Sequence, residues 1–82
     1  MSDSINTAII QEVNAVGLLC PLPILRFKKR VKFLPSGTVV EFFTDDPTGR
    51  KDLESLCNIA GHNIQEVDML AQGVVRFRVV LA

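Results

Sequence analysis

The residues best suited to chemistry lie in the stretch Cys20-Pro21-Leu22-Pro23, three residues after Gly17. A helical apolar pattern begins immediately afterwards, so we expect Pro21 and Pro23 in the first helical turn, where backbone N–H groups have no intrahelical partner to lose. Cys20 then takes the N-cap position. The positive end of the helix dipole and free N–H groups such as that of Leu22 would favour its thiolate. The pattern predicts an exposed, reactive thiol, and the alternative interpretation of Cys20 is a small apolar cap.

Other residues of reactive type fit structural roles better. Cys57 falls on an apolar helical stripe and is expected in the core, because free cysteine packs as a small hydrophobe. His62 follows Gly61 and is expected to help the chain leave a helix, with a catalytic role as the alternative. Asp45 and Asp46 are expected to cap a helix and form a turn rather than act as acid, base or metal ligands. Paired ligands at close spacing are missing, so neither a metal nor a cofactor is expected.

A second candidate site is a docking surface on the first helix. Its basic residues have no acid between them: Arg26, Lys28, Lys29, Arg30 and Lys32. By helical geometry, Leu22, Leu25 and Phe33 project away from the core stripe, on the side of Arg26 and Lys29. Exposed apolar residues ringed by cations are typical of a protein-docking surface, and a solvated helix face is the alternative.

The elements that position these residues follow from periodicity and turn signals. Apolar residues recur at helical spacing after Pro21 and again after Pro47, with Asp46 as N-cap and Gly61 as terminator of the second helix. The expected order is strand 7–13, helix 21–33, strand 38–44, helix 47–60, strand 63–70 and strand 75–81. Two helices cannot cover both faces of four strands, so we expect an α/β (α+β) two-layer sandwich with both helices on one face. The first two strands should be parallel, and the last two should form an antiparallel hairpin across 71–73.

Composition limits the class of protein. The chain has 82 residues, a formal net charge of zero and two cysteines, which indicates one small globular domain, 1–82, rather than a disulfide scaffold. Zero net charge argues against a protein that coats nucleic acid or anionic membrane. The polar N-terminal residues lack the pattern of a signal peptide, and no apolar run is long enough for a membrane helix. We therefore expect a reducing, cytoplasmic compartment.

The motif Gly-Leu-x-Cys-Pro-x-Pro resembles that of the TusA/SirA family of sulfur-carrier proteins, and the resemblance covers nearly the whole chain. It continues in the run Asp45-Asp46-Pro47 and in Cys57 followed by Gly61-His62. It implies the two-layer sandwich and a sulfurtransferase in which Cys20 accepts sulfane sulfur as a persulfide. The implied partners are a donor protein, such as a cysteine desulfurase or rhodanese-type enzyme, and an acceptor protein. The implied end uses are tRNA thiolation, molybdenum-cofactor enzyme maturation and sulfur oxidation.

One position departs from the family pattern, and other functions stay open. Asn14 stands six residues before Cys20, where the family usually has Asp; Asn still caps a turn but carries no charge. One alternative function is an RNA- or DNA-binding module that uses the basic helix, although zero charge and the absence of Tyr and Trp disfavour it. The other is a regulatory interaction domain in which Cys20 does no chemistry.

Overall fold

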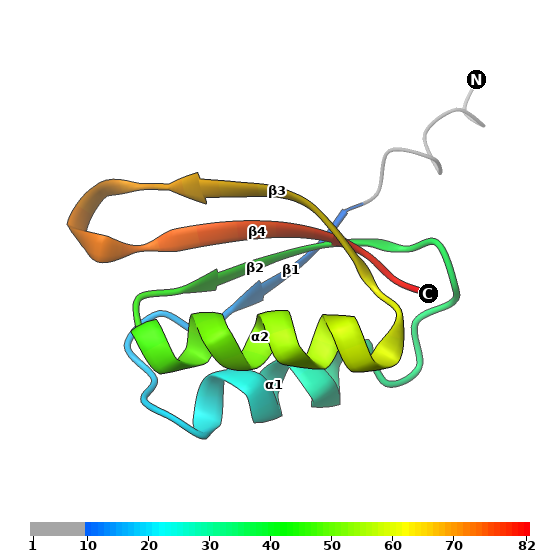
Figure 1. The fold of residues 1–82 in the computed structure, drawn as a ribbon, viewed down its shortest axis with the longest axis horizontal. Coiled ribbons are helices and arrows are strands. Elements are labelled where there is room, and N and C mark those ends of the chain that lie inside the picture. The colour runs from blue at the N-terminus through cyan, green and yellow to red at the C-terminus, as the bar shows by residue number, and fades with distance from the viewer. Residues whose placement is uncertain (1–9) are drawn as a thin grey trace.

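The computed structural model describes residues 10–82 (Figure 1). Within this range the chain forms four strands and two helices, in the order expected from the sequence. Their bounds are β1 (Ile10–Asn14), α1 (Leu22–Val31), β2 (Val39–Thr44), α2 (Pro47–Ala60), β3 (Asn63–Met69) and β4 (Val75–Val80). The start of the first predicted strand, 7–9, lies outside the described residues.

The strands form one mixed sheet in the order β1-β2-β4-β3. β1 pairs with β2 in parallel, whereas β4 pairs antiparallel with both β2 and β3. Figure 1 shows α1 and α2 together on one side of this sheet. The predicted two-layer sandwich, with a parallel first pair and a final hairpin, is therefore confirmed.

The core lies between the sheet and the two helices. Phe42 on β2 stands opposite Phe77 on β4, and Phe27 of α1 meets Phe42 edge to face with 5.4 Å between ring centroids. Leu53 and Cys57 of α2 are buried in the same cluster. Alternate residues of β4 are buried, as the period of two along a strand requires. Burial of these large apolar side chains holds both helices against the sheet.

The other face of the sheet carries charge. Glu41 on β2 lies in register with Arg78 on β4 and accepts hydrogen bonds from Arg78 at 2.9 Å and from Arg76 at 3.4 Å. Arg76 also contacts Glu66 and Asp68 on β3. This face is therefore a cross-strand ion network, and the apolar core lies entirely on the helical side.

The ends of α2 match the sequence signals. Asp46 is the N-cap, Pro47 is the first helical residue, and Gly61 ends the helix in the left-handed region at φ 83°. A side chain at Gly61 would be strained, because that region suits glycine. The expected apolar stripe of α2 is shorter than predicted, since Ala60 is exposed.

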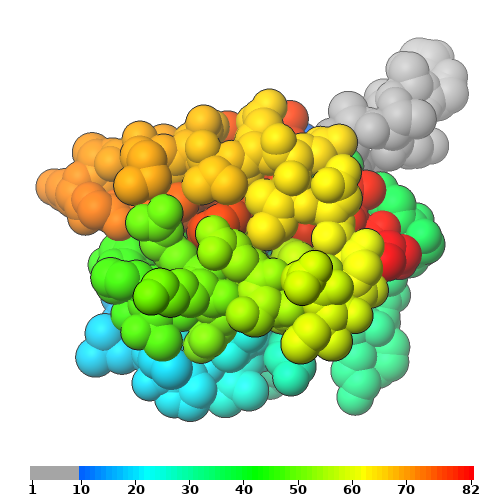
Figure 2. Space-filling model, viewed as in Figure 1, coloured from blue at the N-terminus to red at the C-terminus, as the bar shows by residue number. Residues whose placement is uncertain are grey.

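The final hairpin turns through a short 3-10 segment, Ala71–Gly73, as predicted for a connection of that length. Gln72 adopts φ 59° and Gly73 φ 77°, the positive values that reverse the chain here. In the space-filling view the orange end of this hairpin extends past the green start of α2 (Figure 2). The tip of the hairpin is therefore not covered by the helical layer.

Candidate functional site

The candidate site lies where the parallel strands β1 and β2 reach their carboxyl ends. The loop after β1 carries Cys20, and the turn after β2 carries Asp45 and Asp46. Both helices begin at this end of the molecule, so the Cys20 loop lies beside the start of α2 (Figure 1). Loops at the carboxyl ends of parallel strands are a common place for functional residues in α/β proteins.

Two carboxylates tie the Cys20 loop to the start of α2. The Gly17 N–H donates to Oδ1 of Asp45 at 3.0 Å, and the Cys20 N–H donates to Oδ2 of Asp46 at 2.8 Å. Oδ1 of Asp46 accepts at the same time from the N–H of Thr48, which caps the helix. The predicted capping role is confirmed for Asp46, and the structure adds a long-range role for both aspartates. They hold the backbone at Gly17 and at Cys20, at the two ends of the segment that contains Leu18 and Leu19.

A hydrogen bond at the start of the Cys20 loop also holds its conformation. Oδ1 of Asn14 accepts from the N–H of Val16 at 2.9 Å, so Asn14 caps a turn as expected. Gly17 follows at φ 87°, a conformation that favours glycine. The path of the backbone therefore favours glycine at position 17, where the backbone N–H donates to Asp45.

The N-cap predicted for Cys20 is wrong by one residue. Pro21 occupies the N-cap, α1 begins at Leu22, and no side chain caps the helix; Pro23 does lie in the first turn. The Leu22 N–H donates to the carbonyl of Leu19 at 2.8 Å, so it is not free for the sulfur. The Cys20–Pro21 peptide is cis. The hydrogen bond from Leu22 to Leu19 closes a turn through Cys20 and Pro21, and this turn takes the place of the expected direct entry into the helix.

The electrostatic expectation for Cys20 is also overturned. Its side chain is exposed, and its S–H donates to Oδ2 of Asp52 on α2, with 3.6 Å between sulfur and oxygen. Desolvation, the hydrogen bond to Asp52 and the negative charges of Asp52 and Asp46 raise the pKa of the Cys20 thiol. The resting form is therefore the thiol, because carboxylates nearby disfavour a second negative charge.

Asp52 is the functional residue that sequence reasoning missed. The signal that could have found it is Gly49, a glycine inside a helix and one turn before Asp52. A Cβ at Gly49 would stand 3.1 Å from Cβ of Pro23 and 3.1 Å from Oγ1 of Thr44. Gly49 therefore lets α2 approach the start of α1 closely, and residues three apart on a helix share a face. This close approach brings Asp52 to the sulfur.

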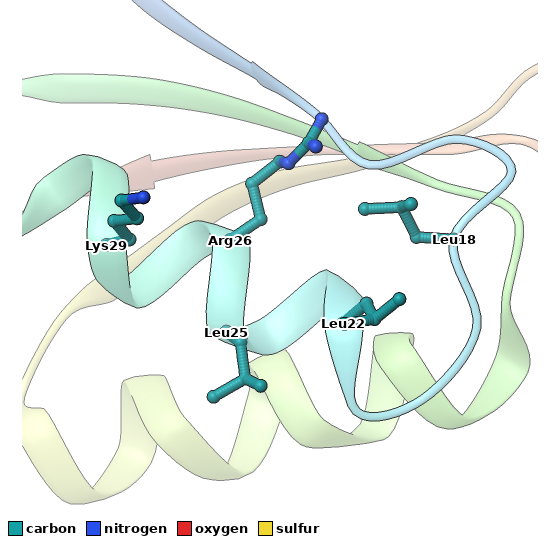
Figure 3. Close-up of a pocket in the computed structure, with 5 residues that line it drawn as sticks. All are labelled: Leu18, Leu22, Leu25, Arg26 and Lys29. Carbon is teal, nitrogen blue, oxygen red and sulfur yellow. The ribbon is translucent and has the colours of Figure 1, made fainter.

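An apolar pocket lies on α1 beside the Cys20 loop. It has a volume of about 260 Å³ and is lined by Leu18, Leu22, Leu25, Arg26 and Lys29. Figure 3 shows Leu18 extending from the loop toward Arg26, with Leu22 below it at the start of the helix. Four of the five predicted docking residues line the pocket, and Leu18 is an addition that the helical pattern did not include.

The remaining docking residue lies elsewhere. Phe33 is 86% exposed but follows the end of α1, and Lys32 lies over its ring at 5.4 Å. Arg26 extends toward β1, where its guanidinium donates to the carbonyl of Asn14 at 3.0 Å (Figure 3). Leu19, next to the cysteine, is 71% exposed. The apolar surface near the thiol is thus made by leucines of the loop and of the first turns of α1.

Cys57 and His62 do not belong to this site. Cys57 is buried in the core as predicted, and burial raises its pKa to about 11. His62 lies just past the far end of α2, and its Nδ1 accepts from the N–H of Ala82 at 2.9 Å. This bond agrees with the predicted structural role for His62. Among residues 10–82, His, Cys, Asp and Glu side chains form no group of three that could hold a metal ion.

Comparison with known proteins places the chain in one family. The sequence profile of the family described as Sulfurtransferase TusA matches residues 11–80. The chain is 35% identical over 65 residues to the sulfur carrier protein TusA of Pseudomonas syringae, covering 78% of this chain and 77% of that one. It is 41% identical over 56 residues to the sulfur carrier protein TusA of Allochromatium vinosum, covering 68% and 74%.

A solved structure shows the same fold. The crystal structure of a SirA-like protein from Desulfitobacterium hafniense superposes with a TM-score of 0.74 at 27% identity, covering 88% of this chain and 96% of that one. The fold and site define a small α+β protein with a single exposed thiol. The chain belongs to the TusA family of sulfur carrier proteins.

Proposed function

We propose that this protein carries sulfane sulfur as a persulfide on Cys20 and relays it between proteins, with residues 1–82 as one carrier domain. The observation that supports this most directly is a free, exposed thiol on a loop fixed by Asp45 and Asp46. Family membership supports sulfur transfer as the chemistry. Cys57 is buried, so a second thiol is not available beside Cys20 for dithiol redox chemistry.

The transfer step requires the Cys20 thiolate. It attacks the outer sulfur of a persulfide on the donor protein, a new S–S bond forms, and the donor's own S–S bond breaks. The donor cysteine leaves as a thiolate and takes up the proton that Cys20 lost. An acceptor cysteine then removes the outer sulfur from Cys20 by the same exchange. Gly17, Pro21 and Pro23 shape the loop that presents the sulfur.

The pocket on α1 is the proposed docking site for these partners. Its floor is apolar and its rim carries Lys29 and Arg26, which suits a partner with an apolar side chain flanked by acidic residues. The donor class proposed is a cysteine desulfurase or rhodanese-type enzyme, and the acceptor is a protein thiol. The two free cysteines are consistent with the reducing cytoplasm as the site of action. No helix among residues 10–82 is long and apolar enough to cross a membrane.

Intact mass spectrometry tests the proposal. The protein is incubated with a cysteine desulfurase and cysteine and then weighed with and without a reductant. A reducible gain of one sulfur atom is expected for the wild type and for Cys57→Ser, and no gain for Cys20→Ser. Absence of the gain with desulfurase, rhodanese and inorganic polysulfide donors would reject the carrier function.

A further inference from the structure

The Cys20 sulfur faces carboxylates and no compensating cation along its own segment. Asp52 reaches it from α2 at 3.6 Å, and the charge of Asp46 acts from the residue before that helix. The sequence neighbours of Cys20 from Leu18 to Pro23 carry no titratable side chain. The arrangement is unexpected for a nucleophile, because a reactive thiol is usually activated by positive surroundings.

The contact with Asp52 is built into the packing of the two helices. Gly49, one turn before Asp52, lies close to Pro23 and Thr44, and a Cβ at this position would stand only 3.1 Å from each of them. Asp46 holds the Cys20 backbone from the same helix start. Both contacts connect the Cys20 loop to α2, so the packing of the loop against α2 holds the backbones of Cys20 and Asp52 close enough for their side chains to meet.

We propose that Asp52 is a positioning residue that holds Cys20 of the empty protein as a neutral, hydrogen-bonded thiol until a docked partner displaces or neutralises the carboxylate. The part of this proposal that concerns sulfur relay rests on the proposed function. The part that concerns the protonation state of the Cys20 thiol does not. The thiolate is the reactive species, so the free protein resists small oxidants and electrophiles. During transfer the S–H proton goes to the departing donor thiolate, and Asp52 gains no proton overall.

The pH profile of Cys20 alkylation tests this assignment. Wild type, Asp52→Asn and Asp52→Glu are treated with iodoacetamide across a range of pH, and the adduct on Cys20 is followed by peptide mass mapping. Asp52→Asn should lower the midpoint of the alkylation profile by about one pH unit. This is the size expected when a charge 3.6 Å from the sulfur is removed. Ten times more thiolate, offset by its lower intrinsic nucleophilicity, gives an alkylation rate near neutral pH about threefold higher. Asp52→Glu keeps the charge and should keep a midpoint above that of Asp52→Asn.

Glu54→Gln is the matched control, because it removes one negative charge from an exposed position on the same helix. Its midpoint should equal that of the wild type. An unchanged midpoint in Asp52→Asn, or an equal shift in Glu54→Gln, would overturn the assignment. The assay involves no sulfur transfer, so it is decided separately from the carrier function. If the protein shows the expected alkylation profile but accepts sulfur from no donor, the carrier function is rejected and the role of Asp52 is still supported.

Discussion

The backbone N–H of Cys20 donates a 2.8 Å hydrogen bond to Oδ2 of Asp46, which also caps α2 through its other oxygen. One carboxylate thus joins the Cys20 loop to the start of a helix 26 residues later in the chain. The helix cannot lose its cap without also loosening the loop. The fold and the presentation of the thiol are coupled at this residue.

Asp46→Ala should therefore lower stability and free the loop together. Loss of the cap is expected to cost about 1–2 kcal/mol in the free energy of unfolding, measured by urea denaturation. Amide exchange at Cys20 should become faster, because its N–H loses its acceptor. Asp46→Asn should keep either the cap or the loop bond but not both, because its one side-chain oxygen accepts and its amide NH2 group does not. Unchanged exchange at Cys20 in Asp46→Ala would contradict the coupling.

Gly49→Ala should destabilise the protein even though alanine favours helix by about 1 kcal/mol. The added Cβ would stand 3.1 Å from both Pro23 and Thr44, a contact tight enough that we expect α2 to shift slightly away from α1. Overpacking of this kind costs about 1–3 kcal/mol, so we expect a net loss of about 1 kcal/mol in urea denaturation. The alkylation midpoint of Cys20 should also fall as Asp52 moves away. The exposed Ser55→Ala on the same helix is the control, and a stability gain in Gly49→Ala would show that the contact is not restrictive.

Cys57 should make stability fall at alkaline pH. Its folded pKa is raised to about 11 from 9.0, so between these values the unfolded chain has lost a proton that the folded protein keeps. Raising the pH then favours unfolding, with a slope approaching about 1.4 kcal/mol per pH unit. Urea denaturation of wild type and Cys57→Ala from pH 8 to pH 11 measures the difference, because groups shared by both proteins cancel. Parallel curves for the two proteins would contradict the prediction.

Leu25→Ser should weaken sulfur loading from a protein donor without affecting loading from a small one. Leu25 lines the α1 pocket, and loss of a central apolar contact typically lowers kcat/KM about tenfold. Loading from inorganic polysulfide needs no docking and should stay at the wild-type rate. Phe33→Ser, at a more exposed position eight residues further on and outside the pocket, should behave as wild type with the desulfurase. Equal losses for both variants would move the docking surface toward the end of α1.

Much of the fold could be predicted from local signals. The alternation along β4, the Asp46-Pro47 helix start and the Gly61 stop each act within a few residues, and the structure agrees with all three. The exposed Cys20 and the buried Cys57 could be separated for the same reason, because one follows a turn and the other falls on an apolar stripe.

The ionisation of Cys20 could not be predicted in this way. The prediction considered the helix that follows the cysteine, whereas the governing charge is on Asp52, thirty-two residues away. Periodicity places Asp52 on α2 but does not show how close α2 comes to the loop. That distance depends on tertiary packing at Gly49, and the pocket residue Leu18 was missed because it belongs to a loop with no periodic pattern.

Basic side chains and carboxylates lie on opposite sides of the Cys20 loop. Lys29 and Arg26 line the pocket on its α1 side, while Asp45, Asp46 and Asp52 surround the loop on its α2 side. An approaching protein therefore meets positive charge on the α1 side of the sulfur and negative charge on the α2 side, rather than a patch of one charge. Only a surface with the reverse polarity, acidic toward α1 and basic toward α2, gains from both halves at once. For the proposed docking partner, this polarity would favour one rotational orientation before any sulfur atoms touch.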